Sequence, residues 1–182
     1  MRAEVIDAVL AAYRRIDVRL AAFCGRSGLH CPPGCGECCG SPEVETSVLE
    51  ALPLARELWR TGRAPAVLER LDAAGDAGAC IFYSPGRLHH GAGRCEVYPL
   101  RPTLCRTFGF AAVRDKRGRA RLATCRVLKR LVPDAVERAQ RAVDAGRDAL
   151  VIAEATGEVV GIDPGLGRER LPINLAVRRA LE

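Results

Sequence analysis

The sequence is poor in aromatic residues, in lysine and in long apolar runs. Aromatic side chains make up 4 % of the 182 residues, with one tryptophan, Trp59, and one methionine, Met1. We therefore expect a core of aliphatic side chains, held together in part by cysteine chemistry. The nine cysteines, about 5 % of the chain, are too few for a short disulfide-stapled secreted domain, and that class is excluded. A content of 48 % hydrophobic and 27 % charged residues argues against a disordered or fibrous chain.

Export and membrane signals are also missing. No stretch approaches the roughly 18 consecutive apolar residues of a membrane span. The first 23 residues show apolar positions at helical spacing, and Asp7 interrupts the apolar run that a secretory signal would need. We predict a helix there and a cytoplasmic protein with no membrane partner. In a reducing compartment, clustered cysteines are more often metal ligands or catalytic thiols than disulfides.

The order of the expected elements predicts a small α+β protein, residues 1–182 forming a single domain. Helices are expected to pack around two short β-hairpins and a cysteine-rich metal-binding loop. Ser47 and Glu50 have the spacing of a capping box at the start of a helix. The hairpins are expected to pair residues 80–83 with 95–98 and residues 108–113 with 120–124.

Three regions are expected within that domain. Residues 24–130 form the cysteine-rich metal-binding core. Residues 131–156 form a C-terminal helix, which Asp134 would cap. Residues 157–182, punctuated by glycine and proline, are expected to be a loosely ordered tail.

Four cysteines lie within nine residues of a glycine-rich loop, a density that a packed core does not require. They are Cys31, Cys35, Cys38 and Cys39. Four more are expected at the ends of the predicted strands, where hairpins can present them toward the loop: Cys80, Cys95, Cys105 and Cys125. Eight thiolates suit two four-sulfur sites, or one cluster and a second metal. Cys24, beside Phe23 at the end of the first helix, is interpreted as a small buried hydrophobic residue.

Thiolates are soft ligands that suit either zinc or an iron–sulfur cluster. Cysteines bunched in one loop with distant partners are more typical of a cluster than of a structural zinc site. We therefore favour an iron–sulfur cluster of the 4Fe–4S type, with zinc as the alternative. Arg101 and Arg106 are expected to lie beside the sulfurs and to stabilise their negative charge, with Tyr98 packing nearby.

The cysteine pattern resembles the YkgJ-type cysteine-cluster family, whose members are described as zinc- or iron-chelating. The resemblance rests on the eight cysteines and on the run Gly93-Arg-Cys-Glu-Val-Tyr-Pro-Leu-Arg-Pro-Thr-Leu-Cys-Arg-Thr-Phe108. It covers about residues 31 to 125 and implies metal binding through these cysteines. Between Cys31 and Cys35 the chain has one residue more than the family's usual two. A related motif occurs in flagellin lysine methylases, which resemble iron–sulfur enzymes that use S-adenosylmethionine.

Three functions remain open at this point, and whether the protein is an enzyme is among the open questions. The first is a metal-binding protein with an accessory or electron-transfer role, whose partners are metal ions and a protein. The second is a cluster-dependent enzyme, with methyl transfer linked to S-adenosylmethionine suggested by the methylases. The third is a structural zinc module that binds protein or nucleic acid, although nucleic acid is not expected because the basic stretch Arg114–Arg121 lacks interleaved aromatic residues. Hydrolase chemistry has no support, since no phosphate loop or Ser–His–acid triad is present.

Overall fold

The computed structural model describes residues 3–32, 35–76, 78–84, 94–147 and 149–182. In chain order, the elements are α1 (Ala3–Ser27), η1 (Glu37–Gly40), β1 (Glu45–Thr46), α2 (Val48–Arg60), α3 (Ala64–Ala74), β2 (Tyr83–Ser84), β3 (Arg94–Cys95), η2 (Tyr98–Leu100), α4 (Thr103–Thr107), β4 (Ala112–Arg114), β5 (Ala120–Leu122), α5 (Arg126–Leu131), α6 (Pro133–Asp144), α7 (Ile152–Val160), α8 (Pro164–Gly167), β6 (Leu171–Pro172) and α9 (Ile173–Leu181). The fold is α+β, as predicted.

The strands of the described residues form three antiparallel two-stranded sheets: β1 with β6, β2 with β3, and β4 with β5. Both predicted hairpins are therefore present, with strands shorter than expected. In the first, the strands also include Ser84 and Arg94 of the predicted turn, while residues 80–82 and 96–98 are not in strands. The turn predicted over residues 84–94, with His89 and His90, lies largely outside the described residues. The pairing of β1 with β6 was not predicted, because strands of two residues that lie 125 residues apart leave no local pattern.

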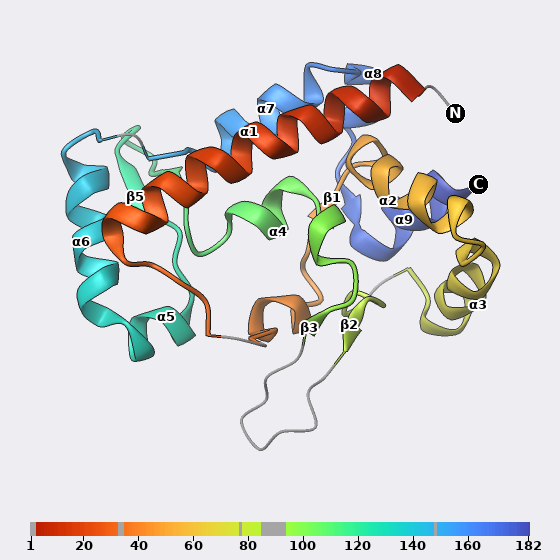
Figure 1. The fold of residues 1–182 in the computed structure, drawn as a ribbon, viewed down its shortest axis with the longest axis horizontal. Coiled ribbons are helices and arrows are strands. Elements are labelled where there is room, and N and C mark those ends of the chain that lie inside the picture. The colour runs from red at the N-terminus through yellow and green to blue at the C-terminus, as the bar shows by residue number, and fades with distance from the viewer. Residues whose placement is uncertain (1–2, 33–34, 77, 85–93, 148) are drawn as a thin grey trace. The chain divides into compact units, whose positions relative to one another are not determined.

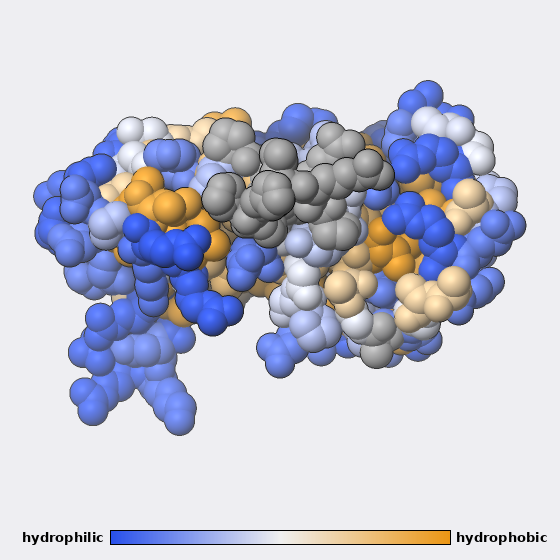
Figure 2. Space-filling view, turned by 90° about the horizontal axis from the view of Figure 1, so that it is seen from below, coloured by the Kyte–Doolittle hydropathy of each residue, from blue (hydrophilic) through white to orange (hydrophobic). Residues whose placement is uncertain are grey.

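The chain divides into two compact units. Unit 1 consists of residues 1–11, 34–102 and 159–182, and unit 2 of residues 12–33 and 103–158. None of the helices in the described part of the chain combines the length and the apolar character that a bilayer-spanning helix needs. Hydrophobic side chains reach the surface in areas separated by hydrophilic ones, as the orange and blue areas of Figure 2 show. Val18, Trp59, Tyr98 and Leu131 are among the large exposed ones.

Unit 1 is built on helices α2, α3 and α9, which pack on one another (Figure 1). The predicted cap is confirmed, because the Ser47 hydroxyl accepts a hydrogen bond from the amide of Glu50 at the start of α2. The core consists mainly of aliphatic side chains, as expected, with Phe82 as its aromatic member. Its members include Leu54, Leu58, Val67, Leu71, Phe82, Val177 and Leu181.

The C-terminal segment corrects the prediction of a loosely ordered tail. Residues 171–172 form β6, and α9 buries one face against the rest of unit 1. The glycines and prolines mark boundaries between elements. Asp163 caps α8 by accepting hydrogen bonds from the amides of Gly165 and Leu166. A side chain at Gly167 would place its Cβ only 3.0 Å from the Cα of Val160, so this glycine permits close packing.

Unit 2 corrects the prediction of one helix over residues 131–156. Helix α6 ends at Asp144, and α7 begins at Ile152. Gly146, at φ 66°, ends α6. Its amide donates a hydrogen bond to the carbonyl of Val143, and the amide of Arg147 donates to the carbonyl of Ala142. This is the bond pattern of a Schellman motif, in which a glycine at positive φ stops a helix.

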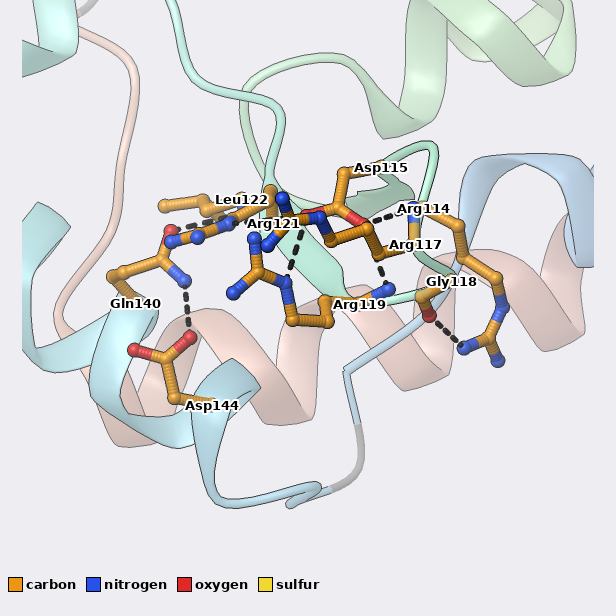
Figure 3. Close-up of polar contacts among 9 residues, drawn as sticks. All are labelled: Arg114, Asp115, Arg117, Gly118, Arg119, Arg121, Leu122, Gln140 and Asp144. Atoms are coloured by element: carbon orange, nitrogen blue, oxygen red, sulfur yellow. Dashed lines mark hydrogen bonds and ion pairs between the residues drawn. The ribbon is translucent and has the colours of Figure 1, made fainter.

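The β4–β5 hairpin of unit 2 is organised around a single carboxylate (Figure 3). Asp115 accepts hydrogen bonds from the amides of Arg117 and Arg119 and from the Arg119 guanidinium. Arg121 lies 3.9 Å from the same carboxylate, and Gln140 of α6 accepts a bond from the amide of Leu122. Part of the positive charge of this basic stretch is therefore balanced within the hairpin.

Candidate metal centre

Unit 1 contains five of the eight predicted ligands. Cys35 precedes η1, and Cys38 and Cys39 lie within it. The amide of Cys39 donates to the carbonyl of Gly36 over 2.9 Å, which closes the short helical turn that holds the two thiols. Cys80 precedes β2, and Cys95 lies in β3 opposite Tyr83. Cys95 therefore lies in the first hairpin, as predicted, whereas Cys80 lies three residues before its first strand.

The Cys38 thiol is the most acidic of the cysteines for which a shift is resolved. A hydrogen bond from Cys39, with help from the backbone and from the positive charge of Arg101, lowers the pKa of Cys38 to about 6 against the effect of burial. Cys38 is therefore largely a thiolate at neutral pH, the form that binds metals. Vicinal cysteines in a tight turn thus create one preformed soft ligand.

The thiols of Cys80 and Cys95 are shifted the other way. Burial, together with the charge of Cys95, raises the pKa of Cys80 to about 11 against the opposing effect of hydrogen bonds from the backbone. Burial also raises the pKa of Cys95, where the charge of Cys38 adds to the increase and Arg101 opposes it. Charges that influence one another in this way lie near one another. Cys38, Cys95 and Cys80 therefore form an electrostatically linked series within unit 1.

Arg101 is the cation that acts on Cys38 and Cys95, whereas Arg70 acts on Cys80. The Arg101 guanidinium lies over the ring of Tyr98, 3.5 Å from the ring centroid, and donates to the carbonyl oxygen of Tyr98 over 3.4 Å. It favours the charged forms of both Cys38 and Cys95. This geometry is compatible with the role predicted for Arg101, and it shows that Tyr98 helps to orient the guanidinium.

Asn174 of α9 is a residue that the sequence analysis missed. Its side chain is 1 % exposed. The side-chain oxygen accepts from the amide of Ile81 over 3.1 Å, and the side-chain nitrogen donates to the carbonyl of Ala79 over 3.2 Å. The two bonds bracket Cys80. The available signal was a polar residue on the otherwise apolar face of α9, which indicates a buried hydrogen bond.

Unit 2 contains Cys31, Cys105 and Cys125. Cys31 is exposed, and Cys105 lies in helix α4 rather than at the end of a strand as predicted. Cys125 lies beyond β5 as the N-cap of α5, where its sulfur accepts from the amide of Leu128 over 3.4 Å. The neighbouring Thr124 hydroxyl is buried with no hydrogen-bond partner among the described residues. A hydroxyl in that state is available to donate to a nearby thiolate.

Arg106 is buried within unit 2. It pairs with Asp17 over 2.5 Å, and its guanidinium carbon lies 4.2 Å from the centroid of the Tyr13 ring. These contacts join α4 to α1, while a role beside the sulfurs stays a prediction. Cys24 is half-buried against the core of unit 2, and burial raises the pKa of its thiol.

The nine cysteines are soft sulfur donors, and none of them is in a disulfide. The lowered pKa of Cys38, about 6, makes its thiol mostly ionised near neutral pH. Over the ranges that the structure describes, no group of three or more His, Cys, Asp or Glu side chains is arranged to hold a metal ion. The chemistry of the donors fits a thiophilic metal.

These features define a cysteine-rich protein of the thiol-ligated metal-binding class. Residues 30–126, just over half of the chain, match the CxxCxxCC family, described as a "Putative zinc- or iron-chelating domain". The chain belongs to this family and carries a metal-binding cysteine-cluster domain. No curated protein and no solved structure matches the chain.

Proposed function

We propose that the protein holds an iron–sulfur cluster of the 4Fe–4S type and serves as an accessory or electron-transfer protein in the cytoplasm. The observation that carries the proposal is the set of eight cysteines within the region that matches a zinc- or iron-chelating family, four of them in nine residues. The lowered pKa of the Cys38 thiol is compatible with a thiolate ligand. A cluster of this kind accepts and donates single electrons.

The cluster takes four thiolates, and a second metal site would take the others. The proposed ligands of the two are the eight cysteines of the motif: Cys31, Cys35, Cys38, Cys39, Cys80, Cys95, Cys105 and Cys125. In unit 1, Cys38 supplies a ready thiolate, and Asn174 fixes the backbone on both sides of Cys80. Arg101 balances negative charge that builds up when several thiolates gather. In unit 2, the Thr124 hydroxyl gains an acceptor if Cys125 becomes a thiolate ligand.

The test is the content of iron, zinc and acid-labile sulfide, with a visible absorption spectrum, of protein purified without oxygen. We expect brown protein with iron and sulfide in comparable amounts. Colourless protein with zinc and no sulfide would replace the cluster by a structural zinc site. Absence of any metal would refute metal binding itself.

Single Cys-to-Ser variants then identify the ligands. Cys38→Ser, Cys39→Ser and Cys95→Ser are each expected to lower the metal content per chain. Cys24→Ser is the matched control, because Cys24 packs in the core of unit 2 and lies outside the motif. Equal metal content in Cys38→Ser, Cys95→Ser and Cys24→Ser would overturn the assignment.

A further inference from the structure

Unit 2 contains a cavity of about 400 Å³ that the proposed function does not use. The last turns of α1 contribute Phe23 and Arg26 to its lining, and α6 contributes Arg138, Arg141 and Ala142. The residues from α6 are spaced three and four positions apart, so they share one face of the helix. Arg147, just beyond α6, completes the rim. The volume is within the range of small-molecule sites, about 300–1,000 Å³.

The lining combines an apolar floor with a cationic rim. Phe23 is 2 % exposed and belongs to the core of unit 2, which makes the floor rigid. Arg138 is fixed by its Nε, which donates to the carbonyl of Ser27 over 3.1 Å. Arg141 pairs with Glu137 at 3.6 Å, but both side chains are about 70 % exposed, so this pair is weak. Among the residues that the structure describes, no acidic side chain lines the cavity.

The ends of the two helices explain why several arginines gather here. Arg26 lies in the last turn of α1 and Arg141 in the last turn of α6. Carbonyl oxygens at a helix C-terminus attract cations, which offsets repulsion between the guanidiniums. The surrounding charge has the same sign. By sequence, unit 2 has 16 lysines and arginines against 8 acidic residues, whereas unit 1 has 12 against 14. Unit 2 therefore attracts anions.

We propose that this cavity binds a small amphiphilic organic anion, with a carboxylate or sulfonate group against the arginines and an apolar body against Phe23 and Ala142. Guanidinium groups bind such oxyanions through paired, charge-assisted hydrogen bonds. The apolar floor selects against small inorganic anions, which have nothing to place on it.

The test is a fluorescence titration of the metal-loaded full chain with 8-anilinonaphthalene-1-sulfonate at low salt. We expect saturable binding with one site per chain and displacement by octanoate. Replacing two rim cations, in the double variant Arg141→Gln and Arg147→Gln, is expected to weaken binding by about tenfold or more. Ala145→Trp, which places a large side chain at the exposed rim, is expected to abolish binding.

The matched control is the double variant Arg117→Gln and Arg130→Gln, which removes the same charge from unit 2 outside the cavity. It is expected to change the affinity by less than about twofold, since distant charges are screened. Equal weakening by both double variants would reduce the effect to overall charge and refute the site. Unsaturable binding, or unchanged binding in Ala145→Trp with native circular dichroism, would also refute it. Displacement by inorganic phosphate as effective as that by octanoate would overturn the apolar half of the proposal.

Discussion

Replacing Asn174 with alanine should loosen the backbone around Cys80. Asn174 makes one hydrogen bond to the amide of Ile81 and one to the carbonyl of Ala79. Because Asn174 is 1 % exposed, alanine leaves a space from which water is largely excluded. The Ile81 amide is part-buried at this bond, so it loses its partner with little compensation from solvent.

The cost can be estimated from these two groups. A buried amide without a partner costs about 1–3 kcal/mol, and an ordinary hydrogen bond contributes about 0.5–1.5 kcal/mol. Ala79 is exposed, so water can replace part of the bond to its carbonyl. We therefore expect Asn174→Ala to lower the free energy of unfolding by about 2–4 kcal/mol, a large part of a typical domain's stability.

Urea unfolding followed by circular dichroism measures this change, and the midpoint should fall by about 1–2 M. Asn174→Asp keeps the acceptor for the Ile81 amide but loses the donor to Ala79 and buries a carboxylate charge. At neutral pH it should therefore lose at least as much stability as alanine. Arg179→Ala, an exposed position on α9, is the control. A change of less than about 0.5 kcal/mol in Asn174→Ala, within the usual range for surface substitutions, would refute this account of the Cys80 segment.

Three further predictions concern charge. In metal-free protein, the rate at which iodoacetamide alkylates Cys38 should rise with pH with a midpoint near pH 6, and Arg101→Gln should move that midpoint upward. Mass spectrometry of the labelled peptide measures the alkylation. An unmoved midpoint would contradict the role of Arg101. Because the pKa of Cys80 is raised to about 11, the Cys80 thiol must lose its proton when it binds a metal. Metal affinity should therefore rise between pH 6 and pH 9, by up to about tenfold per pH unit for each proton released. Competition with a chelator measures this change. Arg170→Met removes the ion-pair partner of the buried Glu50 carboxylate, which keeps its hydrogen bonds from the Thr46 and Ser47 hydroxyls. It should cost about 1–3 kcal/mol in urea unfolding, against about 0–1 kcal/mol for Arg179→Met at an exposed ion pair.

Local patterns predicted the parts of the fold that local physics determines. The cap at Ser47 and both hairpins follow from residue types within a few positions of one another. Gly146 ends α6 as a Schellman glycine, but the apolar spacing continues past it and favours a single helix. Periodicity alone does not distinguish one helix from two that follow in phase.

The order in the C-terminal segment depends on distant contacts, and local composition was misleading there. Pro172 in β6 pairs with Glu45, and α9 packs on α2. Glycine and proline were interpreted as signs of disorder, whereas Gly167 is required where the chain passes close to Val160. Composition indicates how easily a segment turns, and only the contacts it makes elsewhere decide whether it is ordered.

In the candidate site, too, local patterns identify some residues, whereas others depend on distant contacts. Cysteine spacing identified the thiols, since four within nine residues need no tertiary information. Spacing could not show that Cys38 is the acidic thiol, because its pKa depends on Cys39 and on Arg101, which lies 63 positions away. It also could not identify Asn174, whose side chain meets the chain 93 positions earlier.

The family match ends at residue 126, yet Cys80 is held by a helix that begins at Ile173. The backbone on both sides of this proposed ligand is therefore fixed by a segment outside the matched domain. If metal binds at Cys80, binding stabilises the same backbone that α9 stabilises through Asn174, and the two effects are thermodynamically linked. Loss of metal should then raise amide hydrogen exchange in α9 as well as in the hairpin. Exchange that rises in the hairpin while α9 stays protected would show that the matched domain holds its metal independently of the C-terminal helix.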